Sequence, residues 1–556
     1  MTAPAGGSFT GRPSASQRFS FPLISARRMT ILGASIFAAG PCHAEQEPCM
    51  SVFRPHQKQF VLGPGPVHVW PDWNTLAIAD GLVLSVCPKL KVTRLQSRDG
   101  VAYCLLGFPV LSDQVASIAE LFPTKHSSEI EEWTGYWAGK WALVSDHCIW
   151  LDAAGFLRIH YRNVGGRVWL SNSQALLGEH LPDAPDAPYI DWQVRHRNGM
   201  DWIPPPLTTR EGVYKVMPLR TIHPVTGAMR PVRFRPAEMD EGADDNSLAA
   251  AMQTILANWC NSGHRTHYLA LTAGMDTRLL LATARAAKLK VETRTVRYPE
   301  ASKADLALPP RLSAAVGIPH KMVGRPNPPL PLSEVLARTR AIVEHLDGAT
   351  FHPVSAYFAH GLDDFMHDPG KTIAGGWMFA LGRCAYWRRF GNHGLGEALP
   401  TPDQILDAFF THSYDPLPFW STHPRARWRE ALQIWLDSLA EPRALKLDWR
   451  EAFHLDQAAG GWCTDMLRIM DLQDGDYFPP ANCLWLLHLL VRDPVERRKE
   501  AFAHMNAIRI MSPALWKIPT NPLTRKARFK RSVKGLLGDR QAGRLRSILR
   551  RVKGAP

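Results

Sequence analysis

The sequence predicts a mixed fold, in which a β-rich half with antiparallel strands precedes an α/β half with a parallel sheet and helices. Short apolar segments separated by Gly, Asp and Asn turns fill residues 50–210, which is typical of antiparallel strands. From about residue 245, apolar runs alternate with segments of helical periodicity, as in parallel sheets with right-handed crossovers. The length of 556 residues exceeds one ordinary core, so we expect two domains plus extensions.

Within residues 51–210, five segments read as strands: GLVLSVCP, GVAYCLLGFPVL, KWALVSDHCIWLD, FLRIHYR and RVWLSNS. A Pro-rich stretch at 182–188 and 203–207 indicates the edge of this domain. Residues 211–245 then form a linker, in which GVYKVMPLRTIHPVTG reads as two short strands that pair as a hairpin.

Residues 246–522 hold the predicted α/β domain. Its elements, in order, are a helix over SLAAAMQTILANWC, a strand over YLALTAG, a helix over TRLLLATARAAKLK, a strand over VETRTVRY, a helix over ADLALPPRLSAAVG and a strand beginning at residue 320. The remainder, up to residue 522, reads as mostly helical. Pro309 and Pro310 each lack the N–H of a helical hydrogen bond, so we expect them to interrupt their helix and to leave Asp305 in a preceding turn.

The two ends of the chain differ from its body. Residues 1–50 read either as a disordered extension or as a weak signal-like segment, because Arg27 and Arg28 precede a short apolar stretch. Residues 523–556 contain twelve Lys or Arg and one Asp, and so carry most of the net charge of +14. This basic tail is either a solvated helix or a binding segment for an acidic partner or a membrane surface. Phe529 is its one aromatic residue, so we expect no specific nucleic-acid partner.

The composition excludes several classes of protein. Apolar residues make up 45% of the chain and there are 19 Trp, which indicates a globular rather than a disordered protein. The nine Cys are scattered without a CxxC pair, which argues against a disulfide framework or a structural zinc site. Their distribution is compatible with a reducing compartment, so we expect a cytoplasmic location.

The stretch YLALTAGMDTR joins a buried strand to a helix and carries the main chemical signal. Its loop consists of Thr272, Ala273, Gly274, Met275, Asp276 and Thr277, followed by Arg278. Ligands of a parallel sheet bind beyond the carboxyl ends of its strands, and small residues before a helix N-terminus suit a phosphate. The Asp276 carboxylate repels a phosphate unless Mg²⁺ lies between them. The structural alternative makes Asp276 a helix cap and Gly274 a turn residue.

TAGMDT resembles the S-G-G-x-D-S pyrophosphate loop of the N-type ATP pyrophosphatases. With the later KAD at 303–305 and the segment LSAAVGIPHKMV, the chain resembles asparagine synthetases, and among them the divergent asparagine synthase-related proteins. TGYWAGKWALVSDHCIWLDAAGFLRIHYR resembles their glutaminase-type domain, and DYFPPANCLWLLHLLVRDPVERRKEAFAHMNAIRIMSPALWKIPTNP resembles their carboxyl-terminal helices. The resemblance spans about 60–522. It implies an Ntn-hydrolase-like antiparallel domain followed by an ATP-pyrophosphatase domain of the adenine nucleotide α hydrolase-like type.

This resemblance implies an ATP-dependent, AMP-forming amide ligase. ATP and Mg²⁺ are the implied cofactors, with Asp276 holding Mg²⁺ through the pyrophosphate. The implied partners are a small-molecule or peptide carboxylate and an amine or ammonia. The implied nucleotide-binding residues are Thr272 to Thr277, Arg278, Gly375 and Gly376, while Asp305 and Arg383 are implied near the substrate. Arg278 has three readings, in which it reaches a phosphate, faces solvent or pairs with an acidic neighbour. Lys499 and Lys517 are alternative candidates for a catalytic lysine, and each also reads as a surface residue.

Departures from the family pattern leave other functions open. Glutamine hydrolysis needs a Cys whose own α-amine acts as the base, but Cys49 precedes Met50 and no Met-Cys start exists. We therefore expect no ammonia release by the amino-terminal domain. Ala380 stands where the family has an acidic residue that contributes to Mg²⁺ binding. The alternatives are a non-catalytic binding or assembly module and a lasso-type peptide macrolactam cyclase.

Overall fold

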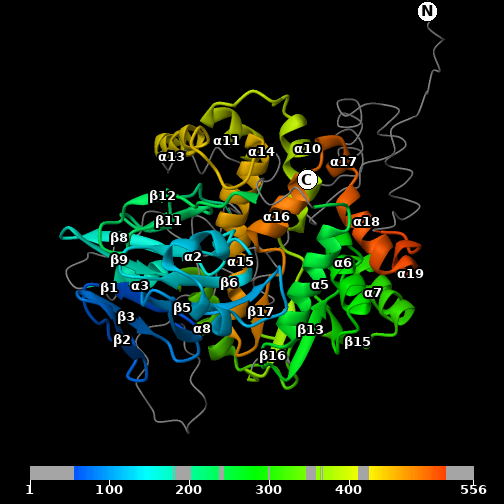
Figure 1. Ribbon diagram of the computed structural model, residues 1–556, viewed down its shortest axis with the longest axis horizontal. Helices are drawn as coiled ribbons and strands as arrows, with labels where there is room; N and C mark the ends of the chain where they lie inside the picture. Colours follow the sequence, from blue (N-terminus) through cyan, green and yellow to red (C-terminus); the bar gives the residue numbers. More distant parts are fainter. Residues whose placement is uncertain are drawn as a thin grey trace, which may run out of the picture.

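A computed structural model describes residues 56–179, 181, 202–236, 243–298, 301–345, 359–362, 365, 367–410 and 425–520. The amino-terminal segment, the first part of the Pro-rich stretch and the basic tail lie outside these described residues. The described part contains two antiparallel sheets and one all-parallel sheet with helices (Figure 1). This content confirms the predicted mixture of antiparallel β and parallel α/β structure. None of the described helices combines the length and the apolarity that a membrane crossing requires.

The two antiparallel sheets pack face to face as a sandwich. The first has the order β10 (Tyr214–Lys215), β8 (His160–Val164), β9 (Arg167–Ser171), β1 (Phe60–Gly63), β3 (Leu82–Val86), β2 (Asn74–Ala79). The second has the order β12 (Met229–Pro231), β11 (Arg220–Ile222), β7 (Ile149–Leu151), β6 (Trp137–Val144), β5 (Ala102–Leu111), β4 (Val92–Gln96). Apolar side chains such as Leu62 and Leu84 from one sheet meet Leu106 and Val144 from the other in a shared buried cluster. This burial is the main stabilisation of the sandwich.

The predicted hairpin over GVYKVMPLRTIHPVTG is wrong in its pairing. β10 pairs with β8 in the first sheet, whereas β11 pairs with β7 and β12 in the second sheet. Between them, Pro218 precedes Leu219, whose φ of 58° lies in the left-handed region. The chain therefore crosses from one sheet to the other at this turn instead of folding back on itself.

The parallel sheet has the order β15 (His320–Val323), β14 (Glu292–Val296), β13 (Thr266–Ala270), β16 (Lys371–Ala374), β17 (Asp476–Phe478). The strands β13, β14 and β15 correspond to the three that the sequence predicts. The strands β16 and β17 lie in the region that the sequence presents as mostly helical, so that prediction is incomplete. They complete the sheet on the other side of β13, which becomes the central strand.

Helices cover the sheets and join the two halves. Those of the β-rich half and its links are α1 (Ile118–Leu121), η2 (Phe122–Thr124), α2 (Ser127–Thr134), α3 (Gln174–Glu179) and α5 (Ser247–Cys260). Those that flank the parallel sheet include α6 (Met275–Ala286) and α7 (Lys303–Val316), whereas α8 (Leu332–His345) packs against α3. The α5 helix packs against both β5 and α6. A single buried cluster therefore runs from the second antiparallel sheet to the α/β half.

The carboxyl-terminal region is built largely from short helices. These are η5 (Phe379–Arg383), α10 (Ala385–Gly391), α11 (Pro402–Phe410), α13 (Arg425–Ser438), α14 (Trp449–Ala452), η6 (Phe453–Cys463), α15 (Thr464–Arg468), η7 (Ile469–Leu472), α16 (Leu484–Val491), α17 (Val495–Lys499), α18 (Phe502–Met511) and α19 (Pro513–Trp516). The α18 helix packs along α6. This contact places α18 beside the helix that follows the TAGMDT loop.

The α7 helix runs without a break through Pro309 and Pro310, so the predicted interruption is wrong. Each proline removes one backbone hydrogen bond, but Leu308, Pro309 and Leu312 are buried, and their packing favours the helix. Ser302 is the N-cap, and its Oγ accepts a hydrogen bond from the backbone N–H of Asp305. Asp305 therefore lies in the first helical turn rather than in a preceding loop.

A buried ion cluster joins the sandwich to the carboxyl-terminal helices. Arg158 Nη2 lies 2.8 Å from Asp465 Oδ1 and also donates to the carbonyl oxygen of Gly461 at 2.9 Å. Lys215 Nζ lies 3.5 Å from the other carboxylate oxygen of Asp465. The side chains of all three charged residues are at most 3% exposed. Water therefore screens these charges weakly, and each depends on the others.

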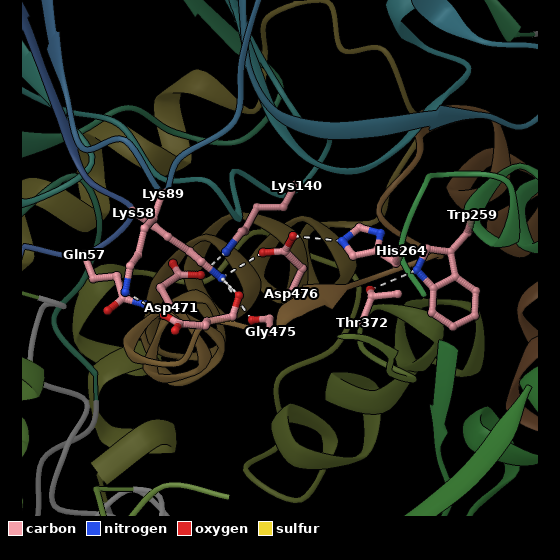
Figure 2. Close-up of polar contacts among 11 residues, drawn as sticks. Gln57, Lys58, Lys89, Lys140, Trp259, His264, Thr372, Asp471, Gly475 and Asp476 are labelled. Atoms are coloured by element: carbon pink, nitrogen blue, oxygen red, sulfur yellow. Dashed lines mark hydrogen bonds and ion pairs between the residues drawn. The ribbon is translucent and has the colours of Figure 1, made fainter. Parts of the chain in front are cut away.

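A second polar cluster lies where the sandwich meets the amino ends of the parallel strands (Figure 2). Lys58 Nζ donates to the carbonyl oxygen of Gly475 at 2.9 Å and to Asp476 Oδ1 at 2.8 Å. The other carboxylate oxygen of Asp476 lies 3.1 Å from His264 Nε2. Nearby, Lys140 pairs with Asp471. These contacts hold β17 against the residues that precede β1.

Asp476→Asn is expected to lower stability at neutral pH, and by a smaller amount in acid. Burial alone raises the pKa of Asp476, but the charge of Lys58 and hydrogen bonds from His264 and Lys58 outweigh burial and hold this pKa well below its usual value. A lowered carboxyl pKa stabilises the fold above the unfolded pKa of about 4, and this contribution disappears as the pH falls further. The loss at pH 7 should be below about 1 kcal/mol, because the Asp476 side chain is 42% exposed and screened.

Urea unfolding of both proteins at pH 7 and pH 3 measures this difference. Asp80→Asn, at an exposed turn residue, is the control. A difference between wild type and Asp476→Asn that stays constant across this pH range would contradict the assignment.

Candidate functional site

The loop from Thr272 to Thr277 lies at the carboxyl end of β13, the central strand of the parallel sheet. Its shape is fixed by its own hydroxyl groups. The N–H of Thr272 donates to Thr277 Oγ1 at 3.0 Å, and the N–H of Gly274 donates to Thr272 Oγ1 at 3.1 Å. Gly274 is the N-cap of α6 and has no side chain with which to cap it. The helix therefore presents its first N–H groups and its positive end without a side-chain acceptor.

Asp305 holds the loop from the next helix. Its Oδ1 accepts a hydrogen bond from the N–H of Ala273 at 2.9 Å, and its Oδ2 accepts one from Ser302 Oγ at 2.6 Å. These bonds assign Asp305 a positioning role in the loop, whereas the sequence places it near the substrate. The link also explains how residues 32 positions apart act in one site.

Gly375 and Gly376 follow β16 and pass close to the loop. A methyl group on Gly376 would come within 2.7 Å of Cβ of Asp276. A methyl group on Gly375 would come within 1.8 Å of the Tyr477 hydroxyl oxygen. Both distances are shorter than carbon or oxygen contacts allow, so glycine is required for this approach. The structure therefore brings the two glycines and the TAGMDT loop together at one edge of the sheet.

Asp276 faces two buried basic side chains. Arg383 Nη2 lies 2.7 Å from Asp276 Oδ2, and the Arg383 side chain is 6% exposed. His504 Nε2 lies 4.0 Å from the other oxygen, Oδ1, which is too long for a hydrogen bond. Within the described chain, neither His504 Nε2 nor Asp276 Oδ1 has a hydrogen-bond partner. The carboxylate is thus held by Arg383 through one oxygen, while its other oxygen is buried without a hydrogen-bond partner.

The electrostatics of this group follow from burial and from Arg383. Burial raises the pKa of Asp276, and the charge of Arg383 opposes that rise. Burial, and then the charge of Arg383, hold the pKa of His504 well below its usual value. His504 is therefore neutral at pH 7, and Arg383 supplies the positive charge beside Asp276.

The turn that carries Arg383 is strained. Met378 and Cys384 flank η5 with φ of 76° and 50°, in the left-handed region that costs a non-glycine residue about 1 kcal/mol or more. Between them, Ala380 is partly exposed and offers no ligand where an acidic residue was expected. The backbone of this turn is instead shaped so that Arg383 meets Asp276.

The buried side chain of Arg278 contacts the carboxyl-terminal segment. Its guanidinium donates to the backbone carbonyls of Leu515 at 3.3 Å, of Ile518, and of Pro519 at 3.0 Å. None of the three sequence readings of Arg278 anticipates this placement. Arg278 joins α6 to the last described segment.

The two candidate lysines also lie outside the loop's contacts. Lys499 Nζ lies 3.3 Å from Glu496 Oε1 and 5.1 Å from the ring centre of Trp387, with its side chain 45% exposed. Lys517 is exposed. In the described structure, neither side chain hydrogen-bonds a loop residue, so the assignment of a catalytic lysine remains a prediction.

His504 is the member of this site that sequence reasoning missed. It lies on α18, whose buried residues recur at helical spacing, so in the sequence it is indistinguishable from a core histidine. Tyr477 was missed as well, because its strand of three residues is too short for a periodic signal. Both reach the site through contacts between distant segments, which no local pattern records.

The described residues contain no group of three or more His, Cys, Asp or Glu side chains placed to hold a metal ion. Two carboxylates contact this loop: Asp276 is bound through one oxygen by Arg383, and Asp305 accepts hydrogen bonds from Ala273 and Ser302. Mg²⁺ in phosphate sites commonly uses one or two carboxylates with phosphate oxygens and water. The arrangement is thus better suited to binding an anion at the helix N-terminus than to a metal centre built by the protein.

No protein-family model matches this sequence. A search of curated proteins likewise finds no match.

Proposed function

We propose that this chain is an ATP-dependent, AMP-forming amide ligase that resembles the asparagine synthetases. The observation that carries the proposal is the start of α6 at the carboxyl edge of a parallel sheet, where the N-cap residue is Gly274 and no side chain caps the helix. Gly376 approaches this start closely, and Asp305 holds the preceding loop through Ala273. Such an edge is where parallel sheets bind ligands, and an uncapped helix N-terminus binds phosphate. In this proposal the finer fold is an ATP-pyrophosphatase domain preceded by an Ntn-hydrolase-like domain.

The chemistry is carboxylate activation, with ATP as a substrate. A carboxylate oxygen of the acyl substrate attacks the α-phosphorus, and pyrophosphate leaves with its bonding electron pair. The nitrogen of an amine or of ammonia then attacks the acyl carbon, AMP leaves, and the nitrogen loses a proton. The chain's own residues position the phosphates: the N–H groups of α6 donate, Asp305 fixes Ala273, and the Thr272–Thr277 contact sets the loop's width.

Mg²⁺ was the expected partner of Asp276, but the residues present fit it poorly. Arg383 holds Asp276, and Ala380 supplies no second carboxylate. No step of the proposed reaction is therefore assigned to the metal.

The β-rich half has a supporting role in this proposal. In this proposal the half releases no ammonia, and its described cysteines are buried or partly buried. The nucleophile is then free ammonia, a small amine or a peptide amine taken from solution. A cytoplasmic location, where ATP is abundant, belongs to the same proposal.

ATP binding to the full chain, measured by calorimetry, tests the proposal. Gly274→Val is the informative variant, because Gly274 has a φ of −72° that valine tolerates, and a side chain there crowds Thr272 Oγ1 at 3.1 Å. We expect it to weaken ATP binding by about tenfold or more, since it blocks the helix N-terminus. Gly65→Val, at a site with nothing within 4 Å, is the matched control. If wild type does not bind millimolar ATP, the proposal fails.

A non-catalytic binding module is the second candidate, and one observation favours it. The ion pair between Asp276 and Arg383 neutralises the carboxylate that the resemblance to asparagine synthetases assigns to Mg²⁺ binding. ATP binding without release of AMP and pyrophosphate, when amino acids and ammonium are supplied, would favour the module over the ligase.

A further inference from the structure

The positive charge that a phosphate site with a carboxylate requires lies beside the loop, on Arg383 of η5. Arg383 Nη2 lies 2.7 Å from Asp276 Oδ2, at hydrogen-bond distance, and its side chain is almost fully buried. The pair is therefore desolvated and close to neutral as a unit. A phosphate placed at the start of α6 meets this pair rather than an isolated carboxylate.

Among the groups around Asp276, Arg383 is the one that neutralises its negative charge. His504 approaches Oδ1 to 4.0 Å, yet it is neutral at pH 7 and brings no positive charge. Both carboxylate oxygens of Asp305 accept hydrogen bonds, one from Ala273 and one from Ser302, so Asp305 supports the loop. Within the described residues, no cluster of metal-ligating side chains replaces these groups.

The backbone around Arg383 supports a dedicated role. Met378 and Cys384, at the two ends of its turn, both have left-handed backbone angles. Just before this turn, Gly376 passes so close to Asp276 that a methyl group there would collide with its Cβ. The left-handed residues and the close approach of Gly376 therefore hold the Arg383 guanidinium beside the Asp276 carboxylate.

We propose that Arg383 replaces the divalent cation at this loop, so that the loop binds the phosphates of a nucleoside triphosphate without Mg²⁺. This inference rests on the proposed ATP site. It concerns how the charge of Asp276 is neutralised, and it makes the opposite prediction to the Mg²⁺ requirement that the sequence suggests.

The test is calorimetric titration of the full chain with ATP, once in EDTA and once in MgCl₂. Wild type should bind with affinities that agree within about threefold in the two buffers. Arg383→Met removes the charge but keeps much of the volume, so its affinity in EDTA should fall by about tenfold or more. MgCl₂ should restore that affinity, because the freed carboxylate then needs a cation.

Three further variants control the experiment. Arg383→Lys keeps a positive charge and should retain binding in EDTA. The double variant Asp276→Asn with Arg383→Met carries neither charge, so it should also bind in EDTA and respond little to MgCl₂. Arg443→Met removes a different arginine, which pairs with Asp456 at 2.9 Å, and controls for general loss of stability.

The outcomes separate the inference from the proposed function. Binding by wild type that requires MgCl₂ would overturn the inference and leave the ATP site standing. Equal affinity of Arg383→Met and wild type in EDTA would also overturn it, because Arg383 would then be dispensable. No ATP binding in either buffer would overturn both.

Discussion

Asp465→Ala is expected to lower the free energy of unfolding by about 3–5 kcal/mol. The substitution leaves Arg158 and Lys215, both almost fully buried, without the carboxylate that they share. An uncompensated buried charge costs far more than an exposed one, since water cannot replace the lost partner. The loss should appear as a lower urea midpoint in unfolding followed by tryptophan fluorescence.

Glu496→Ala provides the matched control for that measurement. Glu496 pairs with Lys499 at 3.3 Å, but the two side chains are 79% and 45% exposed. Pairs of this kind contribute about 0–1 kcal/mol, so the control should unfold almost like wild type. A loss below about 1 kcal/mol for Asp465→Ala would mean that water reaches the cluster.

Arg278→Met is expected to lower the free energy of unfolding by about 2–4 kcal/mol without weakening ATP binding. Burial lowers the pKa of Arg278 to about 10, so the group stays charged at pH 7. Its guanidinium is the donor to three carbonyls of the segment that ends the described chain. Methionine keeps much of the aliphatic packing but leaves those carbonyls without this donor.

Two measurements on the same samples decide the role of Arg278. Urea unfolding reports the loss of stability, and calorimetry with ATP reports affinity. Arg285→Met, at an exposed position on the same helix, is the control. If Arg278→Met weakens ATP binding and leaves stability unchanged, Arg278 contacts a phosphate, as one interpretation of the sequence has it.

Local sequence patterns predicted much of the fold. Alternating apolar runs located the main strands of the sandwich, and the strand–helix alternation from residue 245 located β13, α6, β14, α7 and β15. The strands β16 and β17 were missed, because KTIA and DYF are too short to show a period. Their pairing is decided by β13 and by one another, which are distant in sequence.

The same limit applies to the candidate site. Small and hydroxyl residues before a helix predicted where the loop lies, because these requirements are local. The resemblance named Arg383 as a site residue, but neither its contact with Asp276 nor that of His504 could be predicted, because both span 100 or more positions. The position of the Arg278 side chain likewise depends on backbone carbonyls near residue 515. Backbone carbonyls leave no pattern in the sequence.

The hydrogen bonds between the sandwich and residue 482 also constrain the order of folding. The Asp152 carboxylate accepts hydrogen bonds from the N–H groups of Phe156 and Leu157. It also accepts one from Asn482 Nδ2, which lies 330 positions later in the chain. Asn482 Oδ1 in turn accepts from the N–H of Ala154. During synthesis, the turn at Asp152 emerges long before its partner. The sandwich therefore spends that interval incompletely bonded, and its final packing waits for nearly the whole chain.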